Sequence, residues 1–137
     1  MGVNSGTLRE QTMGISKYDV EVRDRAITES KNPASFLDAV FCIHYYNYET
    51  KHWGPLPKLP DITPEEVFGE FDQAEYQTCL EKSKALLLST AYVGESAHKY
   101  PGAMPYEAAL ERMRKENPGF SPVAYERTAY RAMVAMR

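Results

Sequence analysis

The chain has 137 residues, of which 43% are apolar and 26% charged, and its formal net charge is −3. This length and composition are typical of one globular domain with a core of its own. The slight acidity argues against a nucleic-acid-binding domain, which usually carries a basic surface.

The N-terminus has no basic start followed by an apolar run, which argues against a signal peptide, and no apolar stretch has the length of a membrane span. We expect a flexible N-terminal segment over residues 1–14 and a single helical domain over residues 15–137. Cys42 and Cys79 form no Cys-x-x-Cys pair and lie in apolar stretches. We therefore expect buried free thiols in a soluble, cytoplasmic protein.

Four prolines mark places where helices begin. Proline suits the first helical position because the amide hydrogen that it lacks would have no partner there. The four are Pro33, Pro64, Pro105 and Pro122, and possible capping residues precede three of them, namely Asn32, Thr63 and Ser121. "TPEE" adds Glu66 three residues after Thr63, a capping box, which is the most specific start signal in the chain.

Apolar residues recur at helical spacing between these marks, so we predict an all-α fold. The predicted bundle has about five helices, over residues 16–31, 33–52, 64–93, 105–117 and 122–137. Val20 and Val22 leave a strand as the alternative for the first segment. The stretch "WGPLPKLPDI" predicts an extended Pro-rich crossover between helices 2 and 3, with Leu56 and Leu59 packed on the body.

The last helix presents one apolar face, formed by Val123, Tyr130, Met133 and Val134. We expect this face to point into the core. The Met-rich ending "AYRAMVAMR" would also suit an adaptable binding surface, which is the alternative.

His44 lies among apolar residues of the second helix, and Phe41, Tyr45 and Tyr48 share its face. We expect a hydrogen-bonded core histidine, with a haem ligand or a catalytic base as the alternative. Cys42 and His44 point in different directions on a helix, so they do not form a nucleophile–base pair. The sequence lacks a Gly-rich phosphate loop, Gly-x-Ser-x-Gly and a Rossmann fingerprint, which argues against an enzyme without excluding one.

The pattern Tyr-x-x-Glu-(Ser/Thr)-x-His-x-x-Pro occurs twice, in "YNYETKHWGP" and "YVGESAHKYP". The pairs Glu49/His52 and Glu95/His98 have the spacing of di-iron bundle ligands, for which Glu21, Glu29 or Glu107 would complete the site. Both pairs, however, precede a Gly/Pro stop, and antiparallel packing of helices 2 and 3 would place them at opposite ends. We therefore expect two similar helix endings, with no metal and no other cofactor.

Seven acidic residues and no Lys or Arg lie between Asp61 and Glu81. A solvated helix face would account for them. The sharper interpretation is a docking face on the third helix for a basic protein partner or a second copy of the chain, because a surface of one sign attracts its complement. The expected contact residues are Glu66, Glu70, Asp72, Glu75 and Glu81.

Residues 112–137 are rich in arginine, which would suit head-to-tail self-association with the acidic face. A helix-turn-helix is the alternative for the same region, with a turn at Gly119 and with Tyr125, Glu126 and Arg127 at the start of the second helix, although Glu126 would repel phosphate. We expect a small interaction or regulatory protein that binds a protein partner or itself through charged helical faces. A metal- or cofactor-binding bundle and a helix-turn-helix DNA-binding protein are the alternatives.

Overall fold

The computed structural model describes residues 17–31, 35–49 and 59–135. Helix accounts for 76% of them and no strand occurs among them, so the all-α prediction is confirmed and the strand considered near Val20 is wrong. The helices are α2 (Lys17–Lys31), α3 (Phe36–Tyr48), α4 (Pro64–Phe68), α5 (Gln73–Leu88), α6 (Thr90–Ala97), α7 (Tyr106–Glu116) and α8 (Pro122–Ala135). The predicted flexible segment, residues 1–14, lies outside the described residues.

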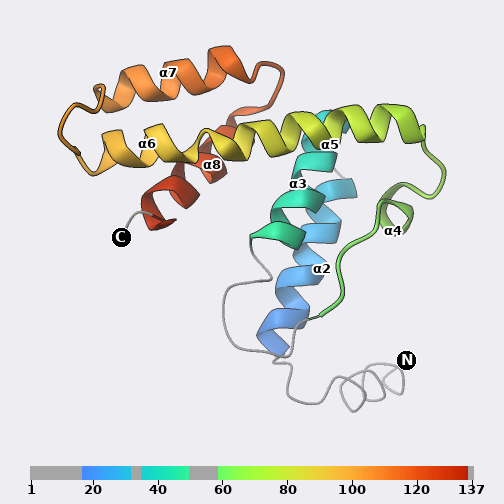
Figure 1. The fold of residues 1–137 in the computed structure, drawn as a ribbon. Coiled ribbons are helices and arrows are strands. Elements are labelled where there is room, and N and C mark those ends of the chain that lie inside the picture. Colours follow the sequence, from blue (N-terminus) through green and yellow to red (C-terminus); the bar gives the residue numbers. More distant parts are fainter. Residues whose placement is uncertain (1–16, 32–34, 50–58, 136–137) are drawn as a thin grey trace.

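Helices α5 and α6 lie end to end and form the long axis of the molecule (Figure 1). Near one end of this axis α3 packs on α5, α2 packs along α3, and the short α4 contacts α2. At the other end α7 and α8 both pack on α6. The axis therefore joins an N-terminal group, α2 to α4, to a C-terminal pair, α7 and α8.

The single helix predicted over residues 64–93 is wrong, because two breaks divide it into α4, α5 and α6. Gly69 ends α4 at φ +70, a left-handed conformation that glycine adopts without a steric penalty. Asp72 then starts α5, since its carboxylate accepts a hydrogen bond of 3.1 Å from the amide of Glu75. The second break lies at Ser89 and leaves α5 and α6 in line (Figure 1).

Side-chain caps also fix where α3 and α4 begin. The capping box predicted between Thr63 and Glu66 is present at the start of α4. The predicted start at Asn32 and Pro33 is wrong, because α3 begins at Phe36. Ser35 is its cap, and the Ser35 hydroxyl oxygen accepts a hydrogen bond of 3.2 Å from the amide of Asp38.

Helix α3 is the central element, because α2, α5 and α8 all pack on it. Val40 and Ile43 are fully buried, and Phe41 is part of the main core together with Leu86 of α5 and Met113 of α7. Tyr48, which was expected to share the apolar face of Phe41 and Tyr45, is the last residue of α3 and is 63% exposed.

Helix α6 ends without the glycine that its stop would favour. Lys99 takes the left-handed position, at φ +55, and the amides of Lys99 and Tyr100 bond to the carbonyl oxygens of Ser96 and Glu95. This is a Schellman ending, for which a residue with a Cβ atom has a conformational cost. Gly102, predicted as the stop, is also left-handed but lies in the turn that follows.

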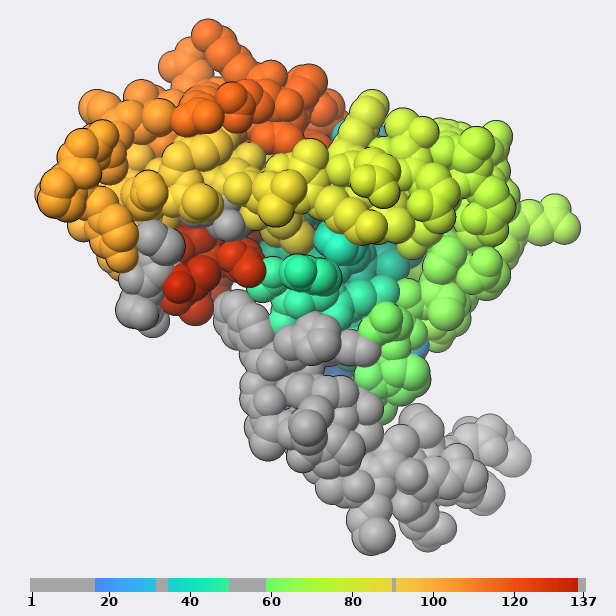
Figure 2. All heavy atoms as spheres, viewed as in Figure 1, coloured from blue at the N-terminus to red at the C-terminus, as the bar shows by residue number. Residues whose placement is uncertain are grey.

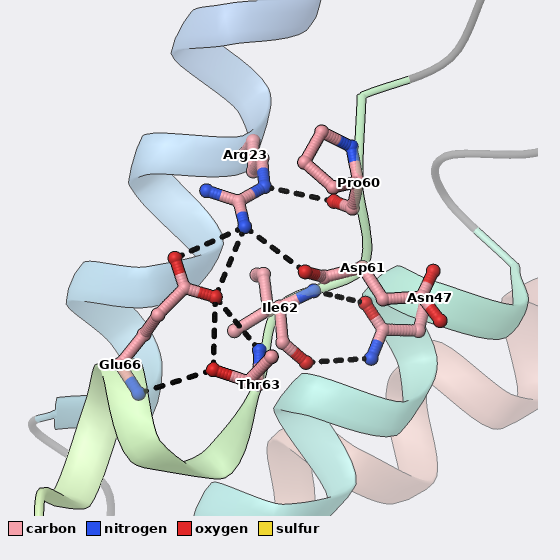
Figure 3. A network of polar contacts seen from close by, with 7 residues as sticks. All are labelled: Arg23, Asn47, Pro60, Asp61, Ile62, Thr63 and Glu66. Atoms are coloured by element: carbon pink, nitrogen blue, oxygen red, sulfur yellow. Dashed lines mark hydrogen bonds and ion pairs between the residues drawn. The ribbon is translucent and has the colours of Figure 1, made fainter.

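The crossover that leads to α4 is fastened to α2 and α3 by polar side chains (Figure 3). The amide nitrogen of the Asn47 side chain donates to the carbonyl oxygen of Ile62 at 2.9 Å, and its oxygen accepts from the Ile62 amide at 2.7 Å. Arg23 donates to the carbonyl oxygens of Pro60 and Asp61, each at 3.0 Å. These bonds satisfy backbone groups that an extended segment leaves without partners. Leu59 is buried as predicted, whereas Leu56 lies outside the described residues.

The paired hydrogen bonds of Asn47 make this side chain important for stability. We expect Asn47→Ala to lower the free energy of unfolding by about 2–3 kcal/mol, because both backbone groups of the buried Ile62 lose their partner. Urea unfolding followed by circular dichroism measures the change. Gln77→Ala, at an exposed position of α5, is the control and should stay within about 0.5 kcal/mol of the wild type. Equal stability of the two variants would show that Asn47 does not hold the crossover.

Candidate functional site

Helix α8 exposes its large apolar side chains instead of burying them. Val123, Tyr130 and Met133 are 52%, 54% and 38% exposed, so the core face predicted for this helix is wrong at these three residues; the fourth, Val134, is half-buried. The buried side consists of small residues, namely Ala124, Thr128, Ala129 and Ala132. Small side chains let α8 approach α6 closely, which leaves the larger ones on the opposite side. We call Val123, Tyr130 and Met133 the α8 ridge.

A groove of about 500 Å³ runs between α7 and α8, beside this ridge. Buried Met113, Phe120 and Ala129 lie at its base, and the exposed charged residues Arg114 and Glu126 lie on its walls. The α7 residues that line it are Tyr106, Leu110, Met113 and Arg114, and those of α8 are Pro122, Tyr125, Glu126, Ala129, Tyr130 and Met133. The groove is therefore mainly aromatic and aliphatic, with one charge of each sign.

The groove remains open because α7 and α8 each pack more extensively on α6 than on each other. The turn between them is held by a buried polar contact. The side-chain amide of Asn117 donates to the hydroxyl of Ser89 at 2.9 Å, and the Tyr125 hydroxyl donates to the Asn117 carbonyl oxygen at 2.6 Å. These contacts fix α7 and α8 relative to each other at the turn that joins them. Along the rest of their length, packing on α6 sets the distance between the two helices.

Carboxylates from α2 and α3 determine how α8 is rotated. Arg127 forms an ion pair with Glu29, and Arg131 forms one of 2.6 Å with buried Glu49. Asp38 accepts a hydrogen bond of 2.9 Å from the last backbone amide before α8. Burial works against the charge of Arg127, but the hydrogen bond to Glu29 and its negative charge raise the pKa of this guanidinium. Both arginine side chains therefore reach across to α2 and to the end of α3.

These contacts do not favour the helix-turn-helix interpretation. A recognition helix needs side chains near its start that reach bases. Tyr125 is bonded to the preceding turn and Arg127 to α2, and exposed Glu126 would repel phosphate. Head-to-tail association through arginines is disfavoured for the same reason, since Arg112 also forms an ion pair, of 3.1 Å, with Glu116.

Of the two Glu-x-x-His motifs, Glu49 caps the end of α3 and His98 caps the end of α6, and the separation expected between the two histidines stays a prediction. Glu49 and His98 both contact the last turns of α8: Glu49 pairs with Arg131, and the Nε2 atom of His98 lies 2.8 Å from the carbonyl oxygen of Met133. Glu95 is half-buried, and His52 lies outside the described residues. Within the described ranges no three His, Cys, Asp or Glu side chains are grouped to hold a metal ion. The absence of a metal stays a prediction.

The five residues of the predicted acidic docking face lie on different elements instead of one helix. Glu66 is in α4, Glu70 in the following turn, and Glu75 and Glu81 in α5, with Asp72 as the cap of α5. Glu66 is exposed, but its carboxylate has a partner within the fold, because the Arg23 guanidinium donates to both of its oxygens at 3.1 Å (Figure 3). Glu81 lies 3.7 Å from Lys84 on the surface. Part of the acidic charge therefore has a structural explanation.

His44 is half-buried at the edge of a second pocket, of about 380 Å³, and stacks on Tyr48 with ring centres 5.3 Å apart. It has no hydrogen bond to another described residue, so the predicted hydrogen-bonded core position is wrong. Burial and the nearby charge of Lys84 lower its pKa. Both cysteines are free, as predicted, but only Cys79 is buried; Cys42 is half-buried beside Arg127.

The comparisons with family models, curated proteins and solved structures find no match to the chain. None of the helices in the described ranges has the length and apolar character needed to cross a membrane. The candidate site is thus defined by its own geometry. Sequence reasoning missed it, although the small residues at positions 124, 128, 129 and 132 could have indicated which side of α8 packs most closely.

The contacts of Glu66 predict different roles for two of the acidic residues. Burial raises its pKa, but the hydrogen bond from the Thr63 amide and the Arg23 guanidinium outweigh this and lower the pKa below its usual value of 4.5. We expect Glu66→Gln to reduce the free energy of unfolding at pH 7 by about 1 kcal/mol, because Arg23 loses its counter-charge in an ion pair that is partly open to solvent. Glu70→Gln, exposed and without an ion pair in the described part of the chain, should change it by less than about 0.5 kcal/mol.

The Glu66 effect should depend on pH in one direction. A lowered carboxyl pKa stabilises the fold above the unfolded value, and this contribution is lost as the pH falls through the folded value. Urea unfolding at pH 7 and again well below pH 4.5 should therefore show the wild type and Glu66→Gln converging in acid. A difference that stays constant between the two conditions would contradict this role of the Glu66 carboxylate.

Proposed function

We propose that this chain is a protein-interaction module whose α7–α8 groove receives an amphipathic helix of a protein partner. The observation that carries the proposal is the α8 ridge, three large apolar side chains left exposed beside an apolar groove of about 500 Å³. Contiguous exposed apolar surface is unusual in a monomeric protein and typically marks an interaction site.

The shape of the groove supports a helix as its occupant. The lining residues of α8 extend from Pro122 to Met133, and those of α7 from Tyr106 to Arg114. At 1.5 Å per residue the α8 wall is about 16 Å long, which corresponds to three helical turns. A helix that lies in a groove uses apolar residues spaced three or four apart over this length.

The chemistry of the groove supports a protein rather than a polar small molecule. Aromatic and methionine side chains dominate it, and these are the residues on which protein interfaces rely most. Arg114 and Glu126 have no ion pair within the described part of the chain and lie on its walls. The complementary surface of the partner therefore carries an apolar helical stripe, with an acidic residue facing Arg114 and a basic residue facing Glu126.

The acidic residues around α4 and α5 are a less favoured docking surface. They lie near the opposite end of the α5–α6 axis from α7 and α8, as the green and orange atoms of Figure 2 show. Glu66 and Asp72 have roles within the fold, which reduces the charge available to a partner. A regulatory role without catalysis, in the cytoplasm, is consistent with the two free thiols.

A labelled model peptide tests the groove directly. The probe is a 16-residue amphipathic helix of leucine, lysine and glutamate, with leucines at helical spacing (about every three to four residues), and binding is followed by fluorescence anisotropy. We expect saturable binding to the wild type and an affinity at least about tenfold weaker (a loss of ~1.4 kcal/mol) for the double variant Tyr130→Glu/Met133→Glu.

The control is Leu88→Glu, since Leu88 is 79% exposed on α5 and does not line the groove. It should bind the peptide as the wild type does, and circular dichroism should show the same helix content for all three proteins. Equal affinity of the double variant and the wild type would overturn the proposal.

A further inference from the structure

We infer that the helix received by the groove is α8 of a second copy of this chain, so that the protein forms a two-fold symmetric dimer. This inference rests on the proposed function and names the partner. The α8 ridge and the groove are neighbours on one face of the molecule, because Tyr130 and Met133 belong to both. In a two-fold dimer each copy inserts its ridge into the groove of the other, and both surfaces are covered at once.

The spacing of residues along α8 suits an antiparallel pair of helices. Val123, Glu126, Tyr130 and Met133 follow one another at intervals of three, four and three residues, which read the same in both directions. An antiparallel copy therefore places Val123 opposite Met133 and Glu126 opposite Tyr130, twice in one interface. The apolar contacts lie at both ends, and the phenol hydroxyl of Tyr130 meets the Glu126 carboxylate between them.

The charges of the groove complement those of a second copy. Near the two-fold axis the two Glu126 carboxylates approach each other, which by itself is unfavourable. Arg114, on the α7 wall of the same groove, supplies one positive charge for each of them. It has no ion pair among the described residues. The interface is thus balanced in charge, as a self-complementary surface has to be.

A closed dimer also fits the remaining arginines better than head-to-tail chains do. Arg112 pairs with Glu116, and Arg127 and Arg131 pair with Glu29 and Glu49. These arginines already form ion pairs within one copy of the chain. The groove face, in contrast, offers an exposed ridge, a hollow and both signs of charge in one place, which favours an isologous contact.

Sedimentation velocity over a range of protein concentrations tests the dimer. The full-length chain should change from monomer to dimer as concentration rises. Tyr130→Glu/Met133→Glu should weaken the dimer at least tenfold, and the control Leu88→Glu should leave it unchanged, with circular dichroism confirming that each variant is folded. Arg114→Glu and Glu126→Arg should each weaken it, and the double exchange should restore most of the loss, because both partner charges are reversed together.

Each outcome decides the inference. A wild type that remains monomeric at every concentration, yet still binds the model peptide, overturns the dimer and leaves the proposed function standing. A dimer that survives Tyr130→Glu/Met133→Glu forms through another face and likewise overturns it. Failure of the double exchange to restore association would show that Arg114 and Glu126 do not face each other across the interface. A wild type that neither binds the model peptide nor dimerises would overturn the proposed function as well.

Discussion

Three carboxylates from α2 and α3 determine the orientation of α8. The exposure of the α8 ridge depends on this orientation. Asp38 holds the start of the helix, Glu29 binds its middle through Arg127, and Glu49 binds its last turns through Arg131. Because Glu49 is only 6% exposed, its charge needs that arginine. With the arginines paired to these carboxylates and the small residues against α6, the α8 ridge has no position in the core and borders the groove.

The sequence predicted the fold class and several helix starts, because these depend on local chemistry. The capping box at Thr63 needs only neighbouring residues, and it is present. Gly69 and Asp72 are a local signal for the break after Phe68. The prediction overlooked this signal because apolar residues recur at helical spacing throughout residues 64–93. A glycine followed by a capping aspartate is the signal that should take precedence over periodicity.

The orientation of α8 could not be predicted in the same way. Hydrophobic periodicity assigns the largest apolar face to the core, and for Val123, Tyr130 and Met133 this gave the wrong side. The true packing side is set by small residues and by ion pairs with residues more than eighty positions away in the chain. The two Glu-x-x-His motifs make the same point, because one glutamate is buried against an arginine and the other is half-exposed. The two motifs have the same local pattern, but their glutamates have different roles because different residues pack against them.

The central claim, that buried Glu49 and Arg131 together fix α8, is tested most directly by a double-mutant cycle. The free energies of unfolding of Glu49→Gln, Arg131→Gln and the double variant are compared with that of the wild type. We expect each single variant to lose about 3 kcal/mol, because a charge is left without its partner. The double variant should lose about 1–3 kcal/mol less than the sum. Strictly additive losses would show that the two side chains act independently and that the pair does not determine the orientation of α8.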